Sequence, residues 1–332
     1  MKVRRGAGVT GSGGATGQPP EAESEQRLDA AQESQMPSSP LSPGSEPGSV
    51  LPSMRWRQLR RVARRPATII AFAGVVGLLL LTVASSWIAP YDPEAINPAD
   101  QFYAPSWQHL FGTDDLGKDV FSRVIAGTHY SLTAVAVVLS SALIIGILVG
   151  ATAGYAGGLV EEILMRITDI FLAFPGIVLA FAVAAALGPG LSSAMAAITA
   201  VWWPTYARLV RGQVLSIKNN DYVDAARSLG ASHFRIIVVH ILRNGIGPVL
   251  VQLTLDMGNV LVTFAGLSFL GLGAEVGTAE WGAMVNAGQQ YTLTDWWLST
   301  FPGLAIFVTA LILNLLGDTI QEILFSGGSF QV

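Results

Sequence analysis

Long apolar runs dominate the hydrophobic pattern of this chain. A helix needs about 20 apolar residues to cross the hydrocarbon core of a bilayer, which is about 30 Å thick. Six segments reach that length, and each is expected to form a transmembrane helix: residues 67–89, 131–153, 163–187, 191–210, 246–270 and 297–320. The pattern therefore predicts an all-α integral membrane protein with six transmembrane helices.

The segments around these runs define the expected organisation. Residues 1–53 are rich in Gly, Ser, Pro, Glu and Gln and hold no aromatic residue, which is typical of a disordered tail. A basic juxtamembrane segment at 54–66 leads into the first span at 67–89, and an extracytoplasmic loop is expected at 90–130. Residues 131–320 form the predicted five-helix core, with a cytoplasmic loop at 218–244, and 321–332 form a C-terminal tail. The turn Gly188-Pro189-Gly190 separates the third and fourth spans, since it cannot continue a helix.

Composition supports a membrane protein. Hydrophobic residues make up 51% of the chain and charged residues 13%, about half the charged fraction of a soluble domain. Such a chain cannot cover the surface of a soluble enzyme of this size. The absence of cysteine excludes disulfides, a thiolate nucleophile and a Cys-ligated zinc.

Basic residues predict the orientation. Six arginines cluster just before the first span: Arg55, Arg57, Arg60, Arg61, Arg64 and Arg65. Positive charge stays on the cytoplasmic side and is attracted to anionic lipid. With the N-terminus inside, the outer loops hold only Lys118 and Arg123 as basic residues, and six spans return the C-terminus to the cytoplasm. Because the arginines adjoin a hydrophobic span, this cluster indicates a membrane anchor and no nucleic-acid site.

Two spans carry informative patterns. Gly146, Gly150 and Gly154 recur at four-residue spacing on the second span, a surface for close helix contact, with packing inside the chain favoured over dimerisation. On the fifth span, polar residues at steps of four, three and four line one helical face: Gln252, Asp256, Asn259 and Thr263. Asp256 is about 18 Å along the helix from Asn244 and so near the bilayer midplane.

An ionisable residue at that depth indicates function by default. We therefore expect the polar face to line a translocation pathway. The alternative for Asp256 is a structural hydrogen bond to a neighbouring helix.

The loop between the fourth and fifth spans predicts a short cytoplasmic helix. Asn220 or Asp221 can cap it, Ala225 and Ala226 favour it, and Gly230 ends it in a left-handed turn. Its small residues leave room for the groove of a partner protein.

This loop resembles the EAA loop of ABC importer permeases, on Asp224-Ala225-Ala226, Gly230 and residues 240–244. Four other stretches agree in order with the C-type subunit of the dipeptide/oligopeptide/nickel class: residues 111–124, 169–175, 267–273, and 301–303 with 314–318. The resemblance covers about residues 55–320.

The resemblance implies a type I importer permease in the plasma (inner) membrane, carrying a coupling helix. Its partners are a homologous second permease, two ATP-binding subunits and an extracytoplasmic substrate-binding protein. ATP and Mg²⁺ belong to the partner subunits, so this chain is expected to need no cofactor and to be no enzyme. The residues implied in coupling are Asp224, Ala225, Ala226, Gly230, Ile241 and Leu242. Di- or oligopeptides are the implied substrates, with nickel or another small solute as the alternative.

Three other patterns are weaker. Residues 112–119 approach a phosphate-binding loop, but Asp119 stands where Ser or Thr is needed to hold Mg²⁺. An intramembrane hydrolase built on Ser268 lacks a histidine base on any predicted span. His233 and His240 have no acidic partners at ligand spacing, so no metal site is expected.

Overall fold

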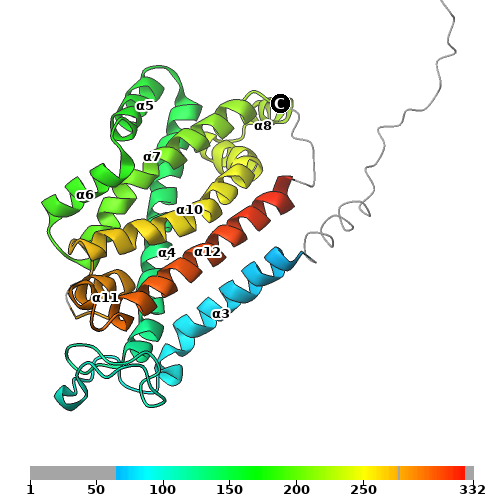
Figure 1. The fold of residues 1–332 in the computed structure, drawn as a ribbon. Coiled ribbons are helices and arrows are strands. Elements are labelled where there is room, and N and C mark those ends of the chain that lie inside the picture. Colours follow the sequence, from blue (N-terminus) through cyan, green and yellow to red (C-terminus); the bar gives the residue numbers. More distant parts are fainter. Residues whose placement is uncertain (1–64, 276, 326–332) are drawn as a thin grey trace, which may run out of the picture. The chain divides into compact units, whose positions relative to one another are not determined.

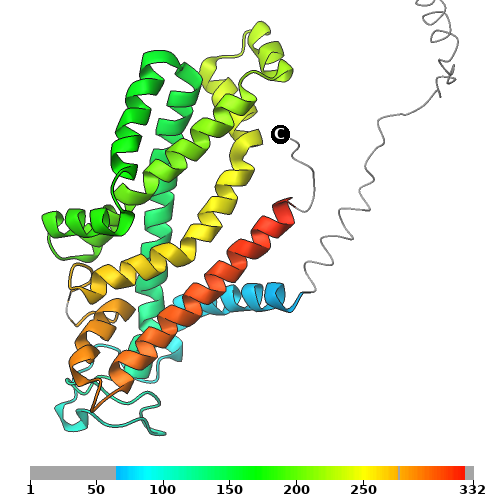
Figure 2. The same cartoon turned by 45° about the horizontal axis from the view of Figure 1, so that its top comes forward.

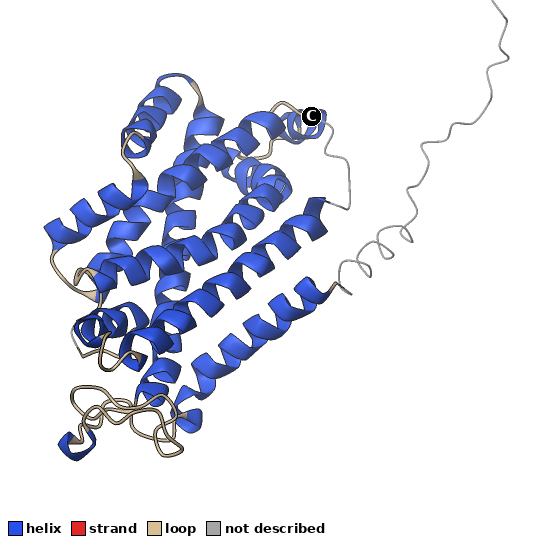
Figure 3. Ribbon diagram, in the orientation of Figure 1, coloured by secondary structure: helices blue, strands red, loops and turns tan. Residues whose placement is uncertain are grey.

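The structure is a computed structural model that describes residues 65–275 and 277–325 (Figure 1). Within these residues all regular elements are helices, which confirms the all-α prediction; Figure 3 shows the same arrangement by type of element. The predicted tail at 1–53 lies outside the described residues, as do most of the basic segment at 54–66 and residues 326–332 of the predicted C-terminal tail.

The helices follow the expected order along the chain. They are α3 (Pro66–Ile88), η1 (Pro98–Asp100), α4 (Val120–Ala156), α5 (Gly158–Leu172), α6 (Gly176–Leu187), α7 (Leu191–Ile217), α8 (Asp221–Ser228), α9 (His233–Arg235), the π-helical η2 (Ile236–Leu242), α10 (Arg243–Phe269), α11 (Trp281–Gly288), η3 (Gln289–Tyr291) and α12 (Trp297–Phe325).

Helix length and hydropathy support fewer spans among the described residues than the six that the sequence pattern predicts. Among the described residues, four continuous helical stretches are long and apolar enough to cross a membrane: Pro66–Ser85, Val120–Ala156, His233–Phe269 and Trp297–Leu324. The pair α5 and α6 qualifies only if its two arms count as one span. The helix α7 covers the predicted fourth span but is not among the qualifying stretches, so the count of six is not confirmed.

The predicted third span is not one straight helix. Its two arms, α5 and α6, meet at an angle of 91°. The break falls at Ala173–Pro175, where proline lacks the N–H that would continue the helical hydrogen bonds. The expectation of a single helix over 163–187 is therefore wrong.

The second span begins earlier than predicted, at Val120 instead of residue 131, so the outer loop ends at Asp119. The Asp119 carboxylate caps α4 by accepting a hydrogen bond from the Ser122 backbone N–H at 2.8 Å. This polar first part of α4 is held by Arg123, whose guanidinium donates to the backbone carbonyls of Gly277 and Thr278. These contacts stabilise the part of α4 before residue 131, which the hydrophobic pattern did not predict to be helical.

The loop that precedes α4 packs on the start of α12. The Phe111 and Phe301 rings stack with centroids 3.9 Å apart, and the Trp297 indole N–H donates to the Thr113 carbonyl at 3.2 Å. Gly112 has a φ of +75° and lies against Trp297, where a side chain would collide. Two of the sequence stretches that resemble importer permeases, residues 111–124 and 301–303, therefore serve to fold this end of the helices.

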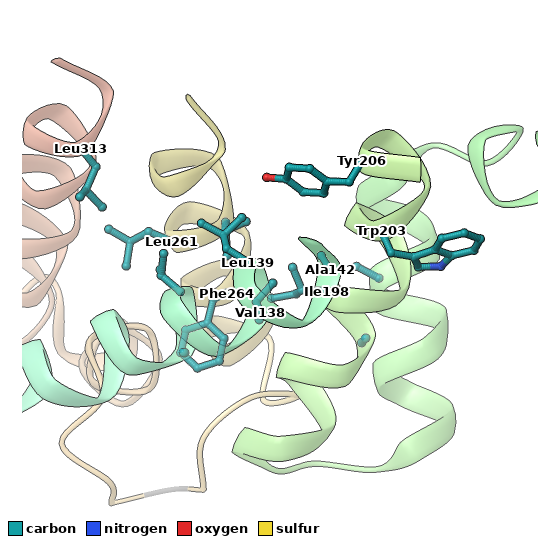
Figure 4. Packing of buried hydrophobic residues seen from close by; sticks show 14 of the residues in the cluster. Val138, Leu139, Ala142, Ile198, Trp203, Tyr206, Leu261, Phe264 and Leu313 are labelled. Atoms are coloured by element: carbon teal, nitrogen blue, oxygen red, sulfur yellow. The ribbon is translucent and has the colours of Figure 1, made fainter. Parts of the chain in front are cut away.

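The core lies between α4, α7, α10 and α12. Figure 4 shows its closely packed side chains, which include Val138, Leu139, Ala142, Ile198, Leu261, Phe264 and Leu313. The glycine stripe on α4 faces α7: Gly146 lies against Tyr206, Gly150 against the Ala207 carbonyl and Gly154 against Val214. The prediction that this stripe packs within the chain is confirmed.

We expect Gly150→Leu to destabilise the folded chain by about 3 kcal/mol, because the added side chain meets backbone that cannot move aside. The measurement is the thermal unfolding temperature of the purified chain in detergent. Gly212→Leu on α7 is the matched control, since no atom lies within 4 Å of a side chain added there. Equal unfolding temperatures for the two variants would contradict this account of the stripe.

The helices present two distinct ends (Figures 1 and 2). One end carries α8 and the junction of α4 with α5, and α12 runs toward it. The opposite end carries the loop before α4, the turn between α6 and α7, and α11. This sorting matches the sides that the sequence predicted for these loops.

Candidate functional site

The short loop helix forms as predicted. Helix α8 spans Asp221–Ser228 and follows Asn220 in extended conformation, although no side chain caps it. Gly230 has a φ of +82°, the left-handed region that favours glycine. Apart from its chain neighbours, no atom lies within 4 Å of the position that a Gly230 Cβ would take, so the backbone conformation and not crowding requires glycine here.

The loop is attached firmly to the helices beneath it. Val223, Ile236 and Ile241 are fully buried. The Lys218 ammonium donates to the Gly154 carbonyl at 2.8 Å, and the Tyr155 hydroxyl lies 2.6 Å from His233 Nδ1. These two contacts join the loop to α4.

The outer surface of the loop is both apolar and charged. Leu229 and Phe234 are 89% and 76% exposed. Arg227 pairs with Asp224 at 2.8 Å on the exposed side of α8. We call Leu229, Phe234 and the exposed side of α8 the loop surface.

The structure separates the predicted coupling residues into two groups. Asp224, Ala225 and Gly230 are exposed and Ala226 is half-buried, so these belong to or adjoin the loop surface. Ile241 is fully buried and Leu242 half-buried in η2, so these two support the loop from below. A π-helical segment is uncommon and often found at functional positions.

The polar face of α10 is also divided. The side chain of Asp256 is buried, whereas Asn259 is exposed and Gln252 and Thr263 are half-buried. The Asp256 carboxylate accepts hydrogen bonds from the Tyr206 hydroxyl at 2.9 Å and from the Gln252 amide at 3.1 Å. Asp256 thus joins α10 to α7, which is the structural alternative considered for this residue.

Tyr206 is the partner that the sequence reasoning missed. Its side chain is fully buried (Figure 4). A tyrosine inside an apolar run needs a partner for its hydroxyl, and this requirement was the available signal. The identity of the partner, 50 residues away, comes only from the packing of α7 on α10.

A second missed residue is Glu280, which precedes α11 at the end of the structure that also carries the loop before α4. Its side chain is fully buried, and its two carboxylate oxygens accept hydrogen bonds from the Gly282 and Ala283 backbone N–H groups, each at 2.9 Å. Burial raises the pKa of Glu280 above its ordinary value. The contribution of Glu280 to the free energy of unfolding is therefore fully present below the unfolded-state pKa of 4.5 and is lost as pH rises through the folded-state pKa.

Glu280→Gln should remove this pH dependence, because glutamine keeps a carbonyl acceptor and cannot ionise. The measurement is the unfolding temperature of the variant minus that of the unchanged chain. We expect this difference to be larger at pH 8 than at pH 5. Glu162→Gln, which neutralises an exposed carboxylate on α5, serves as the control. It should give the same difference in unfolding temperature at pH 5 and at pH 8. The same difference for Glu280→Gln at both pH values would contradict this account.

Other chemistries find no support in the described residues. The described part of the chain contains no group of three or more His, Asp or Glu side chains that could hold a metal ion. The loop at 112–119 ends with the Asp119 carboxylate bound to the α4 N-terminus, the place where a phosphate would have to bind.

The sequence of this chain is similar to a family of known transport proteins. The model of the family described as binding-protein-dependent transport system inner membrane component matches residues 142–327. The probable D,D-dipeptide transport system permease protein DdpC of Escherichia coli strain K12 is 46% identical over 259 residues, which are 78% of this chain and 87% of that protein. The nickel transport system permease protein NikC of the same strain is 41% identical over 245 residues, 74% of this chain and 88% of that protein.

A third relative is the glutathione transport system permease protein GsiD of Escherichia coli O6:K15:H31 (strain 536 / UPEC). It is 41% identical over 271 residues, 81% of this chain and 89% of that protein. The residues matched by the family model include the loop surface, α10 and α12. The chain therefore belongs to the family of binding-protein-dependent transport system inner membrane components.

Proposed function

We propose that this chain is the C-type permease subunit of an ATP-driven importer of di- or oligopeptides. Family membership makes it a permease and not an enzyme. The observation that carries the proposed coupling to ATP-binding subunits is the loop surface. This surface is exposed on one side and attached to the helices on the other. ATP and Mg²⁺ are bound by two partner subunits, and this chain holds no cofactor.

In this proposal, Asp224, Ala225, Ala226 and Gly230 form the contact with an ATP-binding subunit. Leu229 and Phe234 insert apolar side chains beside them, since large exposed apolar groups are typical of protein interfaces. Ile241 and Leu242 transmit the displacement of the loop to α10, with which η2 is continuous. Nucleotide-driven movement of the partner would thereby reach the polar face.

The translocation pathway is proposed to run along α10, between this chain and a homologous second permease. The exposed and half-buried side chains of Gln252, Asn259 and Thr263 line it. Asp256 fixes the orientation of this face through Tyr206. The loop surface, with both chain termini, faces the cytoplasm, and an extracytoplasmic binding protein delivers substrate to the opposite end.

Peptides are favoured as substrates because two of the three relatives described above are named for D,D-dipeptide and glutathione transport. Nickel is the alternative, since the third is named for nickel transport. No metal-binding cluster is found among the described residues of this chain.

The test is uptake by cells with and without the gene for this chain, with its partner subunits present. We expect accumulation of a radiolabelled dipeptide, such as alanyl-alanine, to fall to background without the chain and to return with a plasmid copy. Accumulation of nickel should be unchanged. Loss of nickel accumulation with unchanged accumulation of dipeptides, tripeptides and longer peptides would overturn the substrate proposal.

A further inference from the structure

A cavity of about 450 Å³ lies at the outer end, beyond the polar face of α10. Its lining comes from four parts of the chain: the turn between α6 and α7 (Pro189), the end of α10 and the following loop (Ser268, Glu275), α11 (Asn286) and η3 (Gln289, Gln290). Its size falls within the range of small-molecule binding sites.

The walls of this cavity are held in place before any ligand arrives. Glu280 caps α11 through the Gly282 and Ala283 N–H groups. Gly282 lies against the Ala265 backbone of α10, and Gly288 lies against the Leu298 backbone of α12. The lack of side chains at both glycines lets α11 sit between α10 and α12 at close distance, which fixes the position of Asn286.

The polar groups of the cavity have a defined chemistry. Asn286, Gln289 and Gln290 offer carboxamides, each with a donor and an acceptor, the same pair that a peptide group carries. The Gln289 side-chain amide donates to the Asn286 side-chain oxygen at 2.8 Å, which leaves the Asn286 side-chain NH2 and the Gln289 side-chain oxygen without a partner among the described residues. Glu275 is exposed and makes no ion pair within the described part of the chain.

The charge of the cavity has one sign. The described residues that line it include the Glu275 carboxylate and no lysine or arginine. A carboxylate accepts its strongest hydrogen bonds from a cationic donor. The complementary ligand has a free ammonium group next to amide bonds.

We propose that this cavity binds the amino-terminal end of a short peptide on the outer side, with Glu275 pairing with the peptide ammonium and the three carboxamides binding its peptide groups. The proposal rests on the proposed function in peptide import and assigns a first contact point to that pathway. It also predicts that the chain prefers peptides with a free amino terminus over blocked ones.

The test uses the assembled importer in lipid nanodiscs without its substrate-binding protein. Any preference between the two peptide probes then comes from the membrane-embedded subunits. The probe is Ala-Ala-benzoylphenylalanine, a photoreactive tripeptide with a free amino terminus, compared with its N-acetyl form. We expect the free probe to label residues 268–290, mapped by mass spectrometry, about tenfold more than the acetylated probe. Glu275→Gln should reduce labelling by the free probe to the level of the acetylated one, and Glu275→Asp should retain part of it.

Glu162→Gln is the matched control, because it removes an exposed carboxylate from α5 and leaves the cavity unchanged. The inference is overturned if both probes label the segment equally or if Glu275→Gln labels like the unchanged chain. Dipeptide uptake by the same variants separates the two proposals. Uptake that persists together with unselective labelling would refute the outer site alone, whereas an importer that takes up no peptide would refute both.

Discussion

Gly230→Val is expected to reduce peptide uptake at least about tenfold while the importer remains assembled. Gly230 has a φ of +82°, and valine in the left-handed region costs about 1–2 kcal/mol or more. The backbone after α8 must therefore change, which displaces Leu229 and the exposed side of α8. The measurement is uptake and peptide-stimulated ATP hydrolysis in the same proteoliposomes, with assembly checked by co-purification of the partners.

The control for this prediction is Gly230→Asn. Asparagine enters the left-handed region more readily than other residues with a side chain, and space is open around Gly230. We expect this variant to keep most of the uptake. Normal uptake by Gly230→Val, or an equal loss with Gly230→Asn, would show that the left-handed turn is not what coupling requires.

Asp256→Ala is expected to give the second large effect, a reduction in uptake of roughly tenfold. It leaves the buried Tyr206 hydroxyl without its acceptor, which costs about 1–3 kcal/mol, and removes this hydrogen bond between α10 and α7. Tyr206→Phe should give a smaller loss, because the carboxylate keeps the Gln252 amide as a donor.

The double variant, Asp256→Ala with Tyr206→Phe, should be no worse than Asp256→Ala alone, since both changes break the same bond. Asp169→Asn is the matched control: its ion pair with Arg208 is exposed on both sides and contributes little. Additive losses in the double variant would argue that Asp256 contacts substrate directly.

The sequence predicted the features whose causes are local. The loop helix follows from a capping region, alanines and Gly230, and the structure contains α8 and the left-handed turn. The turn at 188–190 follows from glycine and proline, and it separates α6 from α7 as expected. Burial of the glycine stripe follows from the lack of side chains on one helical face.

The features that depend on contacts between distant residues could not be predicted from the sequence. The apolar run at 163–187 predicted one span, whereas α5 and α6 meet at 91°, an angle that depends on what each arm packs against. Residues 120–130, which include Arg123, were expected to be loop. They are helical in the structure, and the carbonyl groups that bind Arg123 lie 154 and 155 residues further along the chain, where the sequence pattern could not place them. The site residues divide in the same manner: the pattern placed Asp256 on a polar face, and only packing paired it with Tyr206.

The central claim is that the loop surface docks on an ATP-binding subunit, and a single introduced thiol tests it most directly. Because the chain has no cysteine, Leu229→Cys can be labelled with a photoreactive maleimide before the importer is assembled. We expect illumination to join this chain to an ATP-binding subunit, in a yield that changes when ATP is added. Trp107→Cys, at an exposed position of the outer loop, should give no such product. Absence of the crosslinked product at position 229, with the partners present and the importer active, would contradict the account.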